Sequence, residues 1–349
     1  MVRNAECEVT LYQGVIERIS FEAPSLKDNL AKEEVARHLV IYLPQSYSEE
    51  NDRRYPIIYV MHGMEGTPQG WFSENPAEPG LNHIMDSLVA STGLEEMILV
   101  SVDGTSSLKG CWFLNSPVSG NFFDYLTKDV IDVVEKKYRV ASGKRAIFGH
   151  SMGGFSALYA AMHRPDLYQA CAALSPAGMM MRKHDYRQHG DFFKQQIGLL
   201  TTGRECEWFM YAYVAILRAI SPDVNNPPSY ISNDMDTVMA TLEDFHLTSI
   251  AQERVSSFLP YLQGGKTIEE ESDIASTLAL YAEIGTEEGD AVGDPILDSF
   301  NSMIKHFEAL EIPIVHHVFE GGHVDKIEEQ VARGLRFISD EFRILPNPM

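Results

Sequence analysis

Apolar residues along the chain fall into two alternating patterns: short continuous runs and stretches with helical spacing. The continuous runs predict buried strands, which we place at residues 36–44, 55–63, 97–103, 145–149 and 170–174. Apolar positions spaced i, i+3, i+4 and i+7 predict amphipathic helices at residues 81–89 and 126–138. Residues 8–22 predict one or two opening strands. The first half of the chain therefore alternates strands with helices.

The alternation breaks down between residues 178 and 275. This segment has helix-like stretches at 206–220 and 237–258 and a Pro-rich bend at 225–229. The strand–helix pattern then resumes with strands and helices at residues 277–284, 296–307, 314–319 and 331–342. The third of these is the weakest strand prediction, because proline precedes it and two histidines lie within it.

Strands that alternate with helices predict an α/β fold with a mostly parallel central sheet and helices on both faces. The continuous apolarity of residues 55–63 supports burial of both faces. Residues 1–177 and 276–349 then form the core, and 178–275 form a largely helical cap inserted between two core strands. A separate domain docked elsewhere is the alternative. The site should lie at the carboxyl ends of the strands.

The composition of the chain restricts which kinds of molecule it is expected to bind. The chain has 349 residues, of which 44% are hydrophobic, with a formal net charge of −22 and no basic run. Nucleic acid is therefore not an expected partner, because its phosphates would be repelled. No run approaches the roughly 18 apolar residues of a membrane-spanning helix. The amino-terminal residues lack a signal-peptide core, which predicts either a cytoplasmic protein or a processed chain with an added Met.

The four cysteines, Cys7, Cys111, Cys171 and Cys206, show no C-x-x-C spacing, so no zinc site or other metal site is predicted. Their even number leaves one or two disulfides open. Cys171 lies within an apolar run, which predicts a buried thiol.

The segment Gly149-His-Ser-Met-Gly153 lies between a predicted strand and an Ala-rich, helix-favouring run. This is the setting that the G-x-S-x-G nucleophile turn requires. The two glycines allow the chain to bend tightly, which lifts the Ser151 hydroxyl out of the sheet. The turn also directs the Met152 N–H toward the same space. We therefore predict that Ser151 is a nucleophile; a Gly-rich turn with an uninvolved serine is the alternative.

A serine hydroxyl needs a base within hydrogen-bonding reach. His323 follows the last predicted strand and two glycines, in the chain order serine, acid, histidine that α/β-hydrolases use. The acid should follow the strand that ends at Gly285, where Glu287, Glu288 and Asp290 are available. Glu288 is the preferred acid and Asp290 the alternative.

Two backbone N–H groups are needed to stabilise the oxyanion of an acyl-transfer intermediate. We assign them to Met152 and to Met64, in the loop after residues 55–63. Trp112 and Phe113 lie in a loop expected near the site, and Met179 lies where the cap begins. These residues favour an apolar or aromatic acyl group, with core packing as the alternative.

Five stretches together resemble the α/β-hydrolases described as putative esterases, a family that includes feruloyl esterases, esterase D, siderophore esterases and mycolyltransferases. They are residues 55–63, 137–139, 149–154, 285–288 and 321–323. The resemblance implies an α/β-hydrolase fold, a serine nucleophile and no cofactor. It supports Ser151, His323 and the Met64 and Met152 amides in the roles given above. The family usually has Asp where this chain has Glu288, and the extra methylene changes the reach of the carboxylate.

The predicted function is a serine carboxylic ester hydrolase that acts on a small-molecule ester through an acyl-enzyme. A feruloyl-esterase-like substrate with an apolar or aromatic acyl group is expected. An acyltransferase that uses the same residues is one alternative. A non-catalytic binding protein on a hydrolase fold is the other. The sequence leaves the oligomeric state open.

Overall fold

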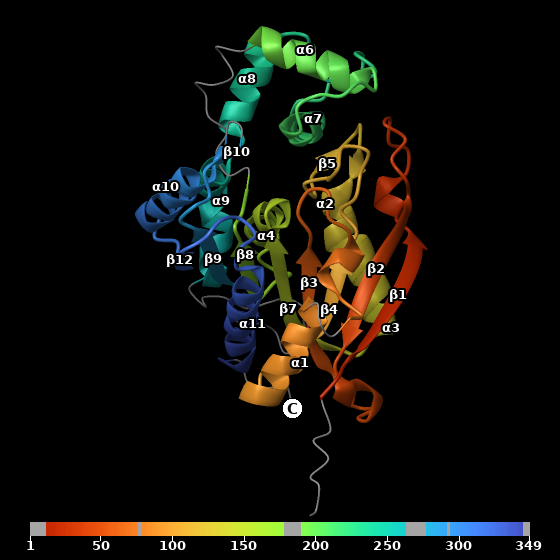
Figure 1. The fold of residues 1–349 in the computed structure, drawn as a ribbon, viewed down its shortest axis with the longest axis vertical. Coiled ribbons are helices and arrows are strands. Elements are labelled where there is room, and N and C mark those ends of the chain that lie inside the picture. Colours follow the sequence, from red (N-terminus) through yellow and green to blue (C-terminus); the bar gives the residue numbers. More distant parts are fainter. Residues whose placement is uncertain (1–11, 76–78, 178–189, 263–276, 292–293, 345–349) are drawn as a thin grey trace, which may run out of the picture.

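The computed structural model of the chain describes residues 12–344, apart from 76–78, 178–189, 263–276 and 292–293. Its centre is an eight-stranded sheet in the order β1-β2-β4-β3-β7-β8-β9-β12 (Figure 1). The strands are β1 (Val15–Glu22), β2 (Ala36–Leu43), β3 (Tyr55–Met61), β4 (Ile98–Val102), β7 (Val140–His150), β8 (Ala170–Leu174), β9 (Ala279–Gly285) and β12 (Val315–Phe319). Strand β2 is antiparallel to β1 and β4, and the other neighbouring pairs are parallel. The predicted mostly parallel sheet is confirmed.

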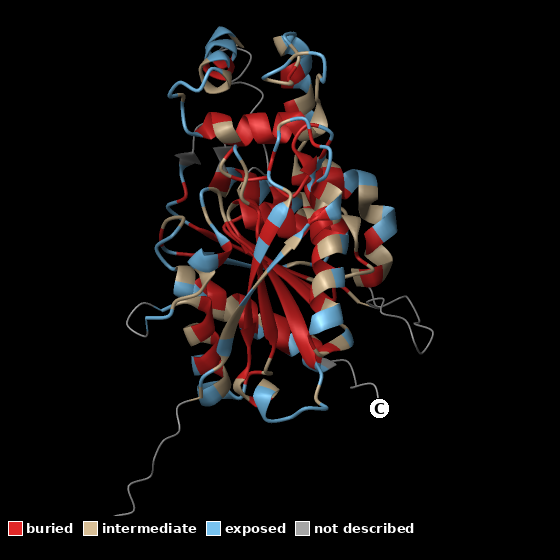
Figure 2. Cartoon of the chain, turned by 90° about the vertical axis from the view of Figure 1, so that its right-hand side faces the viewer, coloured by how far each residue is buried: buried red, intermediate tan, exposed pale blue. Residues whose placement is uncertain are grey.

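Helices cover both faces of the sheet because its central strands are apolar throughout; every residue of β3 is buried. Helices α1 (Leu81–Thr92) and α11 (Ile327–Ile344) pack their apolar residues against one face. The other face is covered by α3 (Val130–Lys137), α4 (Met152–His163) and α10 (Ile296–Ala309). Figure 2 shows the buried strands between helices whose outer surfaces are exposed.

The strand order places β4 on one side of β3 and β7 on the other. Such a reversal opens a crevice at the carboxyl ends of the two strands that flank it, where α/β proteins bind ligands. The loop after β3 and the turn after β7 therefore border one space. A Cβ atom built on Gly63, after β3, would lie 3.2 Å from the Cβ of Ser151, after β7.

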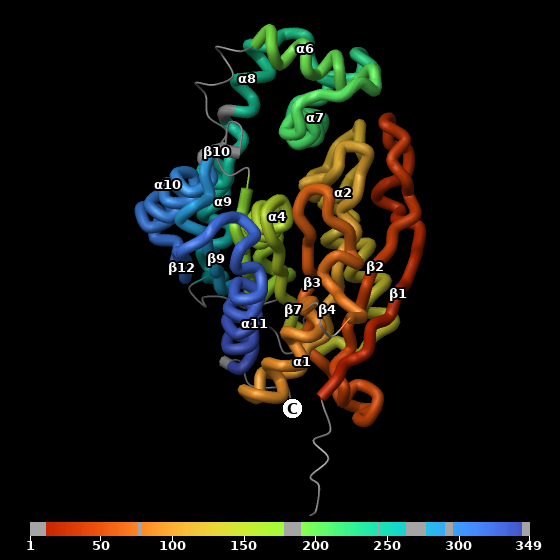
Figure 3. The backbone as a smooth tube through the Cα atoms, in the orientation of Figure 1, coloured from red at the N-terminus to blue at the C-terminus, as the bar shows by residue number. Residues whose placement is uncertain are grey.

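Four helices lie between β8 and β9 in the described residues: α6 (Gly190–Thr201), α7 (Phe209–Ile220), α8 (Met235–Asp244) and α9 (Leu247–Leu262). Helices α6, α7 and α8 stand beyond the end of the sheet, at the top of Figures 1 and 3. Helix α9 instead packs against α4 and α10, and so belongs to the helical cover of the sheet. The inserted segment thus supplies three helices above the core and one beside it.

Most predicted elements are present, with three differences. The helix-like stretch 237–258 is two helices, α8 and α9, separated at Phe245 and His246. The helix predicted at 126–138 begins earlier, with a helical turn at Phe122–Asp124 and a π-helical turn at Tyr125–Asp129 before α3. The loop after β3 contains a 3₁₀ turn, η3 (Pro68–Trp71).

The weakly predicted last strand is β12, at the edge of the sheet. Four of its five residues are exposed, so polar side chains are tolerated there.

Cys171 is buried as predicted, and Cys111, Cys171 and Cys206 are free thiols; Cys7 lies outside the described residues. Among the helices that the structure describes, none has the length and apolarity needed to cross a membrane.

Candidate active site

Ser151 occupies the turn between β7 and α4 with φ 59° and ψ −120°. A positive φ is rare for serine and persists only where the surrounding structure enforces it. Here the Ser151 N–H donates to the Leu174 carbonyl at 3.0 Å, and the Ser151 carbonyl accepts from the N–H groups of Phe155 and Ala177. The strained turn is therefore held by hydrogen bonds to β8, to α4 and to the segment after β8.

The glycines of the turn are required by close backbone packing. A Cβ atom at Gly153 would lie 2.2 Å from the Met61 carbonyl oxygen, and one at Gly149 would lie 2.3 Å from the Gly153 carbonyl oxygen. Neither position has room for a side chain, because the start of α4 lies directly against the end of β3. The predicted need for glycine is confirmed.

His323 forms a hydrogen bond from its Nδ1 to Oε2 of Glu288, with 2.7 Å between the atoms. The Glu288 side chain is fully buried. Its Oε1 accepts from the Ser175 hydroxyl at 2.5 Å and from the Gly285 N–H at 2.9 Å. The structure thus brings together the histidine and the carboxylate that the sequence selected.

The environment of Glu288 keeps this carboxyl ionised. Burial raises its pKa, but the hydrogen bond and charge of His323, with the donors Ser175 and Gly285, outweigh burial and leave the pKa below its ordinary value. An ionised carboxylate only accepts hydrogen bonds, so Nδ1 of His323 carries the proton. Nε2 is then left with a free lone pair, as a general base requires.

Of the other acids considered, Glu287 is exposed. Asp290 has its backbone in the short strand β10 (Asp290–Ala291), paired with β11 (Asp294–Pro295), and its side chain lies outside the described residues.

His150 attaches the His323 loop to the nucleophile turn. Its Nε2 donates to the His323 carbonyl at 2.8 Å, and the two rings lie 4.7 Å apart between centroids. Burial, followed by the neighbouring His323, lowers the pKa of His150 to about 4, so its ring is neutral. The Ser151 hydroxyl itself has no hydrogen-bond partner among the described residues. Serine–histidine bonds in hydrolases often shorten only when substrate binds.

Neither the Met64 nor the Met152 N–H has an acceptor within the described parts of the chain. Met152 is the first residue of α4, where helical N–H groups lack intrahelical partners. The side chains of Met64 and Met152 both lie next to Gly110. A Cβ atom added to Gly110 would lie 2.5 Å from the Met152 sulfur and 3.4 Å from Cγ of Met64. A Cβ at Gly63 would lie 3.7 Å from Ser151 Oγ, so the Met64 loop borders the nucleophile.

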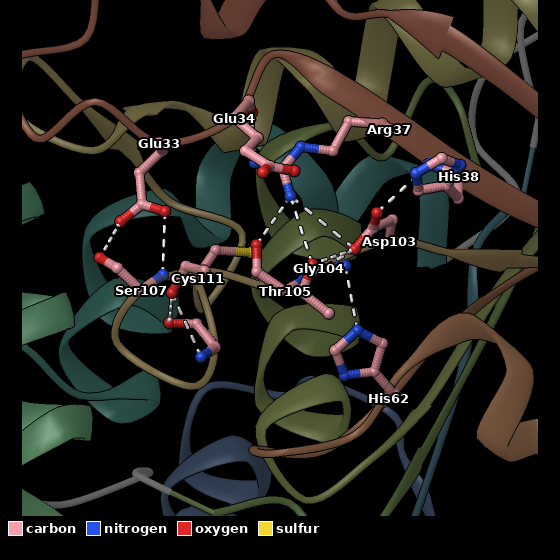
Figure 4. Close-up of polar contacts among 12 residues, drawn as sticks. Glu33, Glu34, Arg37, His38, His62, Asp103, Gly104, Thr105, Ser107 and Cys111 are labelled. Carbon is pink, nitrogen blue, oxygen red and sulfur yellow. Dashed lines mark hydrogen bonds and ion pairs between the residues drawn. The ribbon is translucent and has the colours of Figure 1, made fainter.

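His62 stabilises this loop through its two ring nitrogens. Nε2 accepts from the Gly104 N–H at 3.0 Å (Figure 4). This leaves Nδ1 to donate to the Gly63 carbonyl at 2.8 Å. Burial lowers the pKa of His62, in keeping with a neutral ring. Figure 4 also shows Asp103, after β4, which accepts from Thr105 and faces the buried Arg37. His62 thus has a structural role.

Trp112 and Phe113 were predicted to contact substrate, but they lie in the hydrophobic core. They are 3% and 1% exposed. The Trp112 ring packs edge-on against Phe155 of α4, and the Phe113 ring lies against Gly104. Positive φ angles of 55° and 48° accompany this inward packing, and sequence patterns do not reveal them. The third predicted contact, Met179, lies outside the described residues.

Two groups near Glu288 were missed by the sequence reasoning. Ser175 has a φ of 41°, which accompanies the hydrogen bond from its hydroxyl to Glu288. Glu283 on β9 is buried and pairs with Arg333 of α11, with 2.7 Å between Nη2 and Oε2. Burial raises the pKa of Glu283 to about 6. The local sequence signal at Ser175 is the Ser-Pro pair that follows β8, which by itself indicates only the end of a strand.

The strand order, the sharp turn after β7 and the histidine after β12 define the α/β-hydrolase fold with a serine-hydrolase arrangement of residues. Residues 33–204 match the model of a family described as putative esterase. This match confirms the resemblance drawn from the motifs of the sequence. Within the described residues, no group of three or more His, Cys, Asp or Glu side chains could hold a metal ion.

Curated relatives match only part of the chain. An uncharacterized protein of Corynebacterium glutamicum is 30% identical over 135 residues, which is 38% of this chain and 31% of the relative. The S-formylglutathione hydrolase of Rattus norvegicus is 24% identical over 157 residues, covering 39% of this chain and 50% of the relative. The chain thus spans half or less of the length of these relatives.

Similar solved structures cover nearly the whole chain. A ferulic acid esterase superimposes with a TM-score of 0.63 at 19% identity, covering 95% of this chain and 99% of the other. The S-formylglutathione hydrolase of Staphylococcus aureus gives a TM-score of 0.59 at 12% identity, with 94% and 99% coverage. At these identities the likeness establishes the shared fold.

Proposed function

We propose that this chain is a serine carboxylic ester hydrolase that works through an acyl-enzyme intermediate. The observation that carries the proposal is the hydrogen bond between His323 and the buried Glu288 beside the strained Ser151 turn. A buried carboxylate orients the imidazole and stabilises it once it is protonated. The match to the esterase family over residues 33–204 supports the same reaction class.

In the first half-reaction, Ser151 Oγ forms a bond to the acyl carbon while Nε2 of His323 takes the hydroxyl proton. The oxyanion accepts hydrogen bonds from the Met64 and Met152 N–H groups, which have no other acceptor among the described residues. The ester C–O bond then breaks, and His323 gives its proton to the departing alcohol. Glu288 stays ionised and stabilises the imidazolium.

In the second half-reaction, a water molecule replaces the alcohol. His323 takes one proton from this water, whose oxygen attacks the acyl carbon. The intermediate collapses with cleavage of the bond to Ser151 Oγ, which regains the proton from His323. The carboxylic acid leaves and the enzyme returns to its starting state.

We propose further that the part of residues 178–275 that carries α6, α7 and α8 acts as a cap that closes one side of the substrate site. Trp208, before α7, donates from Nε1 to Oε2 of Glu65 at 2.8 Å. Glu65 follows the proposed oxyanion donor Met64, and its other oxygen pairs with Lys109 at 2.5 Å. Lys109 in turn lies over the ring of Tyr211 on α7, 4.5 Å from its centroid. The cap therefore contacts the loop that would bind the oxyanion.

The acyl group is proposed to be apolar or aromatic. Support comes from the half-buried side chain of Met64, in the loop that borders Ser151, and from the likeness in fold to a ferulic acid esterase. Methionine adapts to varied apolar shapes.

A fluorophosphonate probe tests the proposal directly. We expect the wild-type chain to form one covalent adduct that mass spectrometry assigns to Ser151, and Ser151→Ala to remain unlabelled. Wild type should hydrolyse p-nitrophenyl esters to the free acid, with a loss of roughly 10⁴-fold or more in Ser151→Ala. Ser156→Ala, a hydroxyl on the same helix that bonds the Trp112 carbonyl, is the matched control. Unchanged turnover in Ser151→Ala would overturn the proposal.

A further inference from the structure

We infer that a cavity beside the Ser151 turn binds the leaving alcohol of the ester, and that this alcohol carries a neutral aromatic ring. The inference rests on the proposed hydrolase function and deepens it. The cavity has a volume of about 270 Å³ and lies between the loop after β3 and the starts of α1 and α11. Its lining includes Gly63, Trp71, Ile84, His150, Val324 and Ile327.

The cavity borders the proposed reacting groups on three sides. His150 and Val324 in its lining are the chain neighbours of Ser151 and His323. Gly63, also in the lining, is close enough to the nucleophile that a Cβ atom there would lie 3.7 Å from Ser151 Oγ. An ester bound at Ser151 could therefore extend one of its two substituents into this cavity.

The direction of proton transfer determines whether the acyl group or the alcohol of the ester enters the cavity. His323 must deliver a proton to the departing oxygen, so the alcohol leaves on the histidine side of the acyl carbon. Val324 and the start of α11, including Ile327, follow His323 in the chain and form one wall of the cavity. Trp208 contacts Glu65, which does not itself line the cavity, so the side of the site beneath the cap helices is assigned to the acyl group. The cavity is thus assigned to the alcohol.

The lining favours a neutral, apolar ligand. Trp71, Ile84 and Ile327 supply apolar surface. His62 and His150 also line the cavity, and both have lowered pKa values because they are buried, so they present neutral rings. The carboxylate of Glu328, which lies among the described residues of the lining, would disfavour an anionic alcohol.

The size of the cavity narrows the ligand further. A dry apolar cavity of about 150 Å³ is known to bind benzene, so this larger cavity can hold one substituted ring. A phenol or a benzylic alcohol meets this requirement.

The test separates the two halves of the ester. One series keeps an acetyl group and varies the alcohol from ethanol to 4-methoxybenzyl alcohol; the other keeps ethanol and varies the acyl group from acetyl to phenylpropenoyl. Ile84→Phe fills the cavity from α1, and Val324→Trp blocks it from a position that is 65% exposed and outside the core. Ala90→Phe adds the same ring as Ile84→Phe on an exposed part of α1 and serves as the control.

We expect Ile84→Phe and Val324→Trp to lower kcat/KM for the benzyl acetates at least tenfold. Their losses for ethyl acetate and the ethyl phenylpropenoate should be at least about fivefold smaller than for the benzyl acetates, and Ala90→Phe should leave all esters within about twofold of wild type. Losses that follow the acyl series, or no loss in either series from Val324→Trp, would overturn the inference. Failure of the wild type to hydrolyse any ester would instead refute the proposed function.

Discussion

We call the carboxyl ends of β3 and β7 and the start of α4 the floor of the site. The floor and the helices above it are held in place by different kinds of contact. On the floor, backbone atoms of β3, β7 and α4 approach so closely that Gly149 and Gly153 have no room for a Cβ. Above it, Trp208, just before α7, reaches Glu65 at the surface, where Trp208 is 46% exposed. The proposed reaction chemistry is thus placed where few substitutions are tolerated, whereas the contact between Trp208 and Glu65 lies where side chains can vary. Substitutions in the two regions should differ accordingly.

The largest effect is expected for Glu288→Gln. The amide cannot hold the His323 tautomer or stabilise the imidazolium, so we expect kcat to fall by about 10⁴ with little change in stability. Steady-state hydrolysis of p-nitrophenyl acetate, with circular dichroism to verify folding, measures this. Glu287→Gln, the exposed neighbour, is the control and should retain wild-type activity. A Glu288→Gln enzyme with more than a tenth of wild-type kcat would contradict the assigned acid.

A pair of Gly→Ala substitutions compares the two regions in stability. Gly153→Ala places a Cβ 2.2 Å from the Met61 carbonyl oxygen and should lower the free energy of unfolding by about 3 kcal/mol or more. Gly198→Ala on α6 meets no atom within 4 Å, so it should stabilise by about 0.5–1 kcal/mol. Urea denaturation measures both. If both substitutions changed the free energy of unfolding equally, the proposed difference in packing between the floor and the cap would be wrong.

Acid should destabilise the floor through His150. Its pKa in the folded chain is lowered to about 4, so the unfolded chain binds a proton first as the pH falls. The stability due to neutral His150 is therefore present above about pH 6.5 and is lost progressively toward pH 4, a change of about 2 kcal/mol.

His150→Gln tests this pH dependence, because its amide can still donate to the His323 carbonyl but does not titrate. The variant should lose about 2 kcal/mol less than wild type in unfolding free energy between pH 7 and pH 4.5. Identical pH dependence in the two proteins would show that His150 is already protonated or equally exposed in the folded chain.

The smallest effect is expected for Trp208→Ala. This substitution removes one exposed hydrogen bond to Glu65, so the free energy of unfolding should change by less than about 1 kcal/mol. The kcat/KM for acetyl esters should stay within about twofold of wild type, whereas that for a bulky phenylpropenoyl ester should fall several-fold. Trp208→Phe, which keeps the apolar surface, separates the hydrogen bond from packing. A similar loss for both esters would mean that the cap acts through the oxyanion loop.

The proposed serine, histidine and acid could be selected from the sequence because each follows a strand directly and occurs in a fixed chain order. Ser151 and His323 also carry local signals, since glycines flank both. Glu288 was harder to select because three carboxylates stand within four residues. Its partners decide the choice, and those partners, Ser175 and Gly285, lie on two neighbouring strands.

Residues that depend on tertiary contacts could not be predicted. The inward packing of Trp112 accompanies a positive φ that only the folded loop reveals. The pairing of Glu283 with Arg333 needs both the position of β9 in the sheet and the rotation of α11. The cavity beside Ser151 is formed by three segments that are far apart in the chain.

Two hydrogen bonds link the ends of three neighbouring strands. The Ser151 N–H bonds the last residue of β8, and the Ser175 N–H bonds the Glu283 carbonyl of β9. The ends of β7 and β9, which carry Ser151 and lead to Glu288, are therefore two strand spacings apart, about 10 Å. The segment between β8 and β9 starts and finishes at strand ends whose spacing the sheet determines. Evolution could lengthen, shorten or replace that segment, and so change the accepted ester, without altering the spacing of the strands that carry the proposed nucleophile and acid.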